Sequence, residues 1–273
     1  MDLSYTSVTT MGFLDKLKPT PRWKHADPAV RLEAVRELED PAELAILAES
    51  DPDTRVRRAA IPRTVDTAAL GRIAESDADV ETRDRAADRL VAMATSAGDD
   101  ETAVAAVATL TDSRRLSAIA RSTASDAVRA EALKRTTDPR ALGGIARHAK
   151  HEVTAAAAVA RLDDRDELIE VAQNAEHKDV ALAAFEKLLS PGPDLALLRA
   201  LENKTSQKAV AKRARGIIAD AEAAEAARLA AIEDRRRRQS ALCDAADRAA
   251  ALADAAAIRA ELARLSDAWT AED

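Results

Sequence analysis

Residues 27–76 read DPAVRLEAVRELEDPAELAILAES (27–50) followed at once by DPDTRVRRAAIPRTVDTAALGRIAES (51–76). Both stretches open with Asp-Pro and close with Ala-Glu-Ser. In the second half of these stretches, and twice more along the chain, apolar residues recur at spacings of three and four: Leu44, Leu47 and Ala48; Leu70, Ile73 and Ala74; Leu116, Ile119 and Ala120; Leu142, Ile145 and Ala146. Such spacings put the apolar side chains on one face of a short helix. We therefore interpret each stretch as a helical hairpin of roughly 25 residues.

A hairpin of this kind cannot bury its apolar face alone, and stacking on its neighbours solves the problem. The sequence therefore predicts an all-α fold, an α-solenoid of about seven short hairpins over residues 27–204. We place the units at 27–50, 51–76, 77–98, 99–122, 125–149, 150–175 and 177–204. The third unit lacks a connecting turn, so we expect one longer helix from Val80 to Ala94, before the break at Gly98.

Composition supports the all-α interpretation. Hydrophobic residues make up 47% of the 273 residues and aromatic residues only 2%, with seven Gly and nine Pro. Packing then relies on Ala, Leu, Val and Ile, and alanine has the highest helix propensity. The scarcity of aromatic residues argues against a base-stacking nucleic-acid module, and a net charge of −7 argues against a basic DNA-binding surface.

The single cysteine, Cys243, cannot form an internal disulfide, which favours a reducing compartment. No apolar run reaches the roughly 18–20 residues that a membrane-spanning helix needs. The start of the chain lacks a basic segment followed by an apolar core, as a secretory signal would have. We expect a cytoplasmic protein that has no membrane partner.

The two ends of the chain differ from the repeats. We expect residues 1–26 to form a disordered start and an N-terminal cap, with Trp23 as its anchor. Met11 begins a cleaner amphipathic segment, so residues 1–10 are either disordered or a product of start-codon choice.

Residues 205–273 are expected to form a long helical, coiled-coil-like segment, because no proline and only Gly216 interrupt it. A helix from about Gln207 to Ala251 would be followed by a cap at Asp254 and by a second helix. We expect an antiparallel hairpin in which Trp269 closes onto the longer helix, and a single continuous helix is the alternative. This segment could also make the protein an oligomer.

The stretch WKHADPAVRLEAVREL, residues 23–38, resembles the start of bacterial proteins that combine N-terminal HEAT-like repeats with the domain of unknown function 349. The sequence pattern around Asp51, Pro52, Asp53 and Arg57 also resembles the leucine-rich repeat variant. The resemblance to HEAT-like repeats covers residues 27–204. The resemblance to the domain of unknown function 349 is confined to the C-terminal helices that end at Trp269. Together these resemblances imply an α-solenoid joined to further helical segments, with no assigned reaction. Proteins of this kind usually continue further than this chain.

Residues capable of chemistry are few and scattered. His25, His148, His151 and His177 fall near unit boundaries without a zinc-binding arrangement, and Cys243 has no histidine near it in sequence. Gly143 and Gly144 lie within a helix, where small side chains favour close packing. We therefore predict no catalytic residue, no metal site and no cofactor.

Three arginines recur near the start of a unit's first helix: Arg31, Arg55 and Arg129. HEAT-like units commonly use an Asp and an Arg to connect successive repeats. The resemblance therefore implies a structural ladder whose side chains point into the unit junctions, rather than a ligand site.

A candidate partner-binding groove follows the second helices of the units, through Glu49, Glu75, Arg121, Arg147 and Gln173. If these helices line a concave surface, the groove changes from acidic to basic along its length. Such a surface suits a protein or peptide with its own charge asymmetry. The alternative is an ordinary solvated face.

Two basic clusters lie near the C-terminus: Lys204, Lys208, Lys212, Arg213 and Arg215, and then Arg235, Arg236, Arg237 and Arg238. On one helix, the three lysines would share a face that could contact RNA phosphates or an acidic partner. Residues 205–273 contain as many acidic as basic residues, so a solvated coiled-coil surface is the alternative.

These patterns favour a non-enzymatic scaffold that presents a curved α-solenoid surface to an unidentified protein partner. An RNA- or ribosome-associated protein that uses the basic clusters is the second hypothesis. The third is an enzyme on a HEAT-like scaffold, such as a lyase or a DNA-repair glycosylase. It would require acids and aromatic residues that converge in a groove.

Overall fold

The computed structural model describes residues 20–96, 98–190, 192–251 and 254–270. The expectations for residues 1–19, which include the disordered start, lie outside this range. The described residues form fifteen α-helices and two short 3-10 helices, with no strand among them. The all-α prediction is therefore confirmed.

The chain divides into two compact units, one that ends at Ala184 and one that begins at Phe185. The division lies inside α12 (Lys178–Leu189), rather than at residue 204, where the composition changes. Among the described residues, no helix has both the length and the apolar character needed to cross a membrane.

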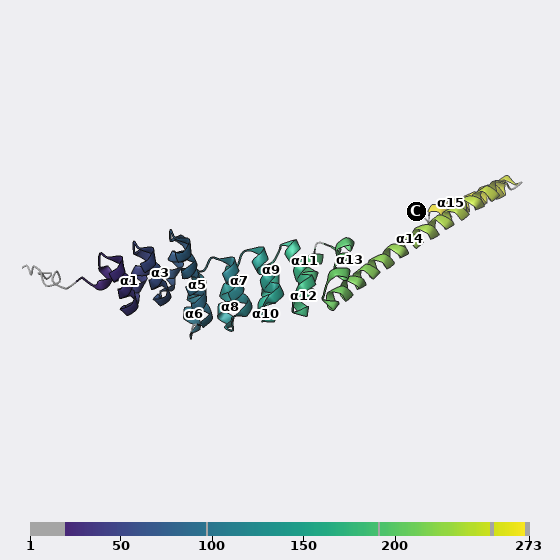
Figure 1. Cartoon of the computed structure of the whole chain (residues 1–273). Helices are drawn as coiled ribbons and strands as arrows, with labels where there is room; N and C mark the ends of the chain where they lie inside the picture. The colour runs from purple at the N-terminus through teal and green to yellow at the C-terminus, as the bar shows by residue number, and fades with distance from the viewer. Residues whose placement is uncertain (1–19, 97, 191, 252–253, 271–273) are drawn as a thin grey trace, which may run out of the picture. The chain divides into compact units, whose positions relative to one another are not determined.

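The first unit contains the repeated helices (Figure 1). Their bounds are η2 (Arg22–Lys24), α1 (Pro28–Glu37), α2 (Pro41–Ser50), α3 (Thr54–Ala60), η3 (Ile61–Arg63), α4 (Thr67–Ser76), α5 (Val80–Ser96), α6 (Asp100–Thr109), α7 (Ser113–Ser122), α8 (Asp126–Arg135), α9 (Pro139–His148), α10 (Glu152–Arg161) and α11 (Arg165–Asn174), followed by α12.

The residues that precede the first helix of each unit recur at a regular interval. The residue before the first helix of each unit stands at position 27, 53, 79, 99, 125, 151 or 177. This interval is constant except between 79 and 99, because the third unit holds the single helix α5 instead of a hairpin. The Asp27 carboxylate accepts from the Ala29 N–H at 2.9 Å, and the Asp53 carboxylate accepts from the Arg55 N–H at 2.8 Å. Such caps satisfy backbone donors that a helix start leaves free.

The expected longer helix in the third unit is confirmed, because α5 runs without a break through the predicted range. It changes the packing of its neighbours. Second helices pack on one another where hairpins are adjacent, as α2 does on α4 and α9 does on α7 and α11. Helix α4, however, packs against α5 and α6.

Alanine and branched aliphatic side chains fill the core, which leaves helices close together. The fully buried side chains include Leu70, Leu90, Leu116, Ile145 and Leu162. At Gly71 a Cβ atom would lie 2.7 Å from Cβ of Thr109, so only glycine fits between α4 and α6 there.

At the N-terminal end of the described residues, η2 packs against α1. Arg22 pairs with Glu33 at 3.0 Å and with Glu37 at 2.8 Å, and both glutamates belong to α1. Trp23 is partly buried on η2. These contacts tie the turn to the first repeat helix.

The second unit contains α13 (Leu195–Lys204), α14 (Lys208–Ala250) and α15 (Ala255–Thr270). Helix α13 packs against the start of α14, where Val210, Ala214 and Ile218 are buried. Helix α15 packs back on α14, so the C-terminal hairpin is confirmed and the continuous helix is wrong. Leu265 is the buried residue of α15, whereas Trp269 stays 39% exposed and closes the hairpin only in part.

Candidate binding groove

Buried arginine–aspartate pairs join the first repeats. Arg31 of α1 donates from Nε and Nη2 to the carboxylate of Asp51, at 2.7 and 2.8 Å. Its Nη1 donates to the carbonyl oxygens of His25 and Ala26. The Asp51 side chain is only 2% exposed. We call this pairing, between the first helix of a hairpin and the residue after its second helix, a rung.

The next hairpin repeats the rung. Arg57 donates from Nε and Nη2 to Asp77 at 2.8 and 2.9 Å, and from Nη1 to the Asp51 carbonyl oxygen at 2.9 Å. Burial by itself raises the pKa of the Asp77 carboxyl, but the hydrogen bonds from Arg57 and from the Asp79 N–H, together with the Arg57 charge, outweigh it and leave that pKa below its usual value. The carboxylate is therefore held in its charged form.

The predicted ladder is right for Arg31 and wrong for Arg55. Arg55 is exposed and folds back onto Asp53, the cap of its own helix, at 2.8 Å. Arg57, two residues further on, takes the rung because its position on α3 faces the junction. Arg129 does lie in a junction, as predicted, but without an aspartate across from it.

The five hairpins between residues 27 and 175 differ at their rung positions. The residue pairs are Arg31 with Asp51, Arg57 with Asp77, Ala103 with Thr123, Arg129 with Ala149, and Ala155 with Ala175. Two rungs are ion pairs and two are small and uncharged. Only the Arg129 rung places an arginine opposite a residue that cannot compensate its charge.

Arg129 is buried, with its side chain 6% exposed. Its Nη1 donates to the carbonyl oxygens of Thr123 and Ala124 at 2.7 and 2.6 Å, as Nη1 of Arg31 does to its own pair of carbonyls. The edge formed by Nε and Nη2 has different partners. Nε donates to Thr154 Oγ1 at 3.2 Å, and Nη2 donates to Asp126, whose side chain is 94% exposed.

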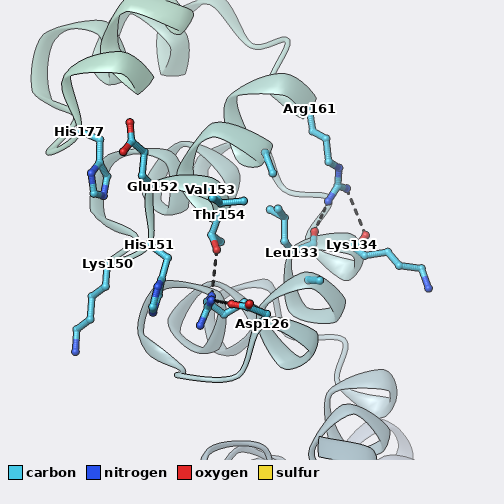
Figure 2. A pocket seen from close by; sticks show the side chains of 13 residues that line it. Asp126, Leu133, Lys134, Lys150, His151, Glu152, Val153, Thr154, Arg161 and His177 are labelled. Atoms are coloured by element: carbon cyan, nitrogen blue, oxygen red, sulfur yellow. Dashed lines mark hydrogen bonds and ion pairs between the residues drawn. The ribbon is translucent and has the colours of Figure 1, made fainter.

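A groove of about 960 Å³ lies at this junction, between α8 and α10. Figure 2 shows its lining, with Thr154 directed toward the hydrogen bond that links it to α8 and Arg161 reaching the end of α8. The small side chains of Ala130 and Ala157, one from each of the two helices, are part of its lining. Val153 adds an apolar wall and is 83% exposed.

The groove is more basic than the protein as a whole. The cations that line it are Arg129, Lys134, Lys150 and Arg161, against the anions Asp126 and Glu152, and His151 and His177 also line it. The whole chain carries a net charge of −7. The volume of the groove falls within the range of ligand pockets, but its lining carries more charged side chains than such pockets usually have.

Ion pairs weaken the charge gradient that the sequence suggests along the second helices. Glu49, Glu75, Arg121, Arg147 and Gln173 do occupy equivalent places, each next to the last residue of α2, α4, α7, α9 or α11. However, Glu49 accepts from Arg72 at 2.6 Å, which lowers the pKa of Glu49, and Arg147 donates to Glu167 at 2.9 Å. The series is also interrupted where α4 meets α5 and α6.

The predicted basic face of the second unit does not exist in the form expected. Lys204 ends α13, whereas Lys208 begins α14, so the lysines do not share one helix. Among the arginines of the two clusters, Arg213 pairs with Glu186 at 3.2 Å, Arg215 with Glu202 at 2.8 Å and Arg237 with Asp234 at 3.6 Å. Acidic neighbours therefore offset part of the positive charge.

Two of the four histidines have contacts with a neighbouring side chain or with the backbone. His148 Nδ1 lies 3.1 Å from Glu176, and His177 Nε2 lies 2.9 Å from the Ala149 carbonyl oxygen. Cys243 is exposed on α14. Among the described residues, no three His, Cys, Asp or Glu side chains are grouped as a metal site would require.

The groove between α8 and α10 was missed from sequence, apart from Arg129. A signal was present in the comparison of the units, since Ala149 stands where the first two hairpins have aspartate. Comparisons of the chain with protein-family models and with curated proteins find no match.

Proposed function

We propose that this protein is a non-enzymatic scaffold that binds a polypeptide segment in the groove between α8 and α10. The groove itself is the observation that carries the proposal. It combines a volume of about 960 Å³ with an exposed apolar wall and a surplus of cations. Helical-repeat proteins commonly bind extended partners along their stacked units.

The hydrogen bonds in the groove favour binding over catalysis. The Thr154 hydroxyl accepts from Arg129, and His177 Nε2 is directed at a backbone carbonyl. A nucleophile needs a base within hydrogen-bond reach, and these two groups are occupied by structural partners instead. The groove thus offers complementary surface and charge.

Two further proposals accompany this function. The lone Cys243 supports a reducing, cytoplasmic location. The residues around Trp23 to Leu38 support a relationship to the bacterial proteins with HEAT-like repeats and the domain of unknown function 349, in which case those proteins would share the scaffold role.

The test uses a displayed library of random peptides selected on the full chain. Ala157 lines the groove, whereas Ala156 is exposed on the same helix and does not line it. Ala157→Trp should fill the groove and abolish the enrichment of peptides, while the matched control Ala156→Trp should leave it intact. Equal enrichment on both variants, or none on the native chain, would refute the proposal.

A further inference from the structure

We propose that the segment bound in this groove carries a carboxylate that completes the Arg129 rung. The inference rests on the proposed function and names the chemistry of the ligand: an acidic side chain flanked by apolar residues. The ligand carboxylate would displace Thr154 and Asp126 from the Nε and Nη2 edge of Arg129, which is the edge that holds Asp51 and Asp77 in the first two rungs.

The two complete rungs, Arg31 with Asp51 and Arg57 with Asp77, show which contacts the Arg129 rung lacks. In both, one carboxylate accepts from Nε and Nη2 of the arginine. The same carboxylate also accepts from the backbone N–H two residues further along, at 2.8 Å in each case, from Asp53 in the first rung and from Asp79 in the second. A bidentate arginine–carboxylate contact is among the strongest polar interactions in proteins.

The Arg129 rung, which lacks the carboxylate, has the same backbone conformation as the two complete rungs. Ala149 has φ −68° and ψ 130°, close to the −64° and 132° of Asp51 and the −59° and 138° of Asp77. The N–H equivalent to those of Asp53 and Asp79 belongs to His151, and His151 lines the groove together with Arg129. The groove therefore brings together Arg129 and His151, the residues that would supply the donors of a carboxylate site, while the Ala149 methyl group itself is buried and does not line it.

The present partners of Arg129 are weaker substitutes. Thr154 is a neutral acceptor at 3.2 Å, and the Asp126 carboxylate is 94% exposed to water. A buried guanidinium whose charge is compensated only by solvated or neutral groups attracts an anion. Lys134, Lys150 and Arg161 also line the groove, against the further anion Glu152, and this surplus of positive charge favours an acidic segment over a neutral one.

The apolar residues of the groove determine which side chains should flank the carboxylate of the bound peptide. Leu133, Val153 and Ala157 form a surface beside Arg129 that would contact aliphatic side chains. An isolated inorganic anion would leave this surface uncovered. The structure thus assigns the groove to a peptide in which an aspartate or glutamate is next to leucine-like residues.

The experiment measures fluorescence anisotropy with two labelled peptides, Ala-Leu-Asp-Leu-Ala and its counterpart with Asn in place of Asp, both with blocked ends. The Asp peptide should bind the full chain at least about tenfold more tightly, because Asn cannot make the charged bidentate contact. Ala149→Asp supplies the missing carboxylate from within and should abolish that preference. Ala156→Asp adds the same charge outside the groove and should retain it.

A second variant keeps the test valid if Ala149→Asp fails to fold, which a thermal melt would show. Arg129→Ala reproduces the uncharged rung that Ala155 and Ala175 already form, and it should also abolish the preference. Equal affinity of the two peptides, with both lost in Ala157→Trp, would overturn the carboxylate inference but support peptide binding in the groove. Failure of both peptides and of the library selection would overturn the proposed function as well.

Discussion

Arg31 and Asp51 show how single residues hold one repeat to the next. Both side chains are almost fully buried, at 10% and 2% exposure, and each satisfies the other's charge. The cost of desolvating such a pair is large, so its net contribution is modest while it is complete. Losing one partner is different, because a charge then stays buried without compensation.

Asp51→Ala should therefore lower the free energy of unfolding by about 3–5 kcal/mol. The double variant Arg31→Ala with Asp51→Ala should cost less, since it reproduces the uncharged rung formed by Ala155 and Ala175. Urea denaturation of the purified variants measures both values.

Arg55→Ala is the matched control for that experiment. The Arg55 side chain is 72% exposed in its pair with Asp53, so its removal should change the free energy of unfolding far less than Asp51→Ala does. If Arg55→Ala and Asp51→Ala proved equally destabilising, burial would not be what makes the rung important.

The Arg57–Asp77 rung predicts a pH dependence. The pKa of Asp77 is lower in the folded state, so the unfolded chain binds more protons at acid pH. The stabilisation is complete above the usual aspartate pKa of about 3.9 and is lost as the pH falls through the lower folded-state value. The difference in melting temperature between the native chain and Asp77→Asn should be large at about pH 7 and should shrink below about pH 4. A difference that grew on acidification would contradict this assignment.

Helix packing in this protein depends on small residues, and two glycines within helices differ in what surrounds them. At Gly71 the nearest atom to a new Cβ is Cβ of Thr109, which is fixed to its backbone. At Gly144 the nearest atom is Ser117 Oγ, at an ordinary contact distance of 3.9 Å. Both positions are in α-helices, so the loss of glycine's backbone freedom is the same and only the neighbours differ.

Gly144→Ala should consequently stabilise the protein by about 0.5–1 kcal/mol, the helix-propensity difference between the two residues. Gly71→Ala should destabilise it, because α4 and α6 must move apart. Thermal melts followed by circular dichroism compare the two directly. Stabilisation by both variants would mean that α4 and α6 are not as close as the structure shows.

Helix α14 is held together differently from the repeat helices. From Ala219 to Arg238 its residues are exposed almost without exception, so packing contributes little there. Ion pairs along the helix surface support it, such as Arg228 with Glu225 at 3.6 Å and Arg237 with Glu233 at 3.8 Å. High alanine content supplies the remaining helix preference.

At the scale of the whole molecule, the balance of charges bears on the RNA hypothesis. Several arginines of the basic clusters already pair with acidic residues. We expect labelled poly-uridine RNA to bind the full chain only weakly at physiological salt, because nucleic-acid affinity depends on the phosphates that free cations neutralise. Replacing Arg235 to Arg238 by glutamine should change this binding little. Tight, strongly salt-dependent binding that this replacement abolishes would favour the RNA-associated function.

The second unit also predicts where the chain can be shortened. Leu198 and Leu201 of α13 are buried, and α13 packs against the first turns of α14. A chain that ends at residue 204 should expose these leucines and self-associate. A chain that ends at residue 224 should keep the contact and stay monodisperse in size-exclusion chromatography with light scattering. Equal behaviour of the two chains would show that α14 does not cover α13.

The amino-acid sequence alone determined the helical repeats, the single long helix at α5 and the break between α14 and α15. These features follow from local rules, since apolar spacing, aspartate caps and the absence of a turn act over a few residues. Arg31 was assigned to a ladder through the resemblance to HEAT-like repeats, and its distance of four residues from the cap at Asp27 agrees with that assignment.

Only the tertiary structure decided where the chain leaves a groove. Arg55 and Arg57 lie on different faces of α3, and only Arg57 enters the junction. Arg57 stands four residues after its helix cap, as Arg31 and Arg129 do, so a signal for it was present in the sequence and was missed. The groove is a space between α8 and α10, which belong to separate units. Small side chains such as Ala130 and Ala157 are part of its lining, and its positive charge includes Arg129, for which Ala149 supplies no carboxylate. Both are properties of side chains that meet in space, and no single segment of the sequence contains them.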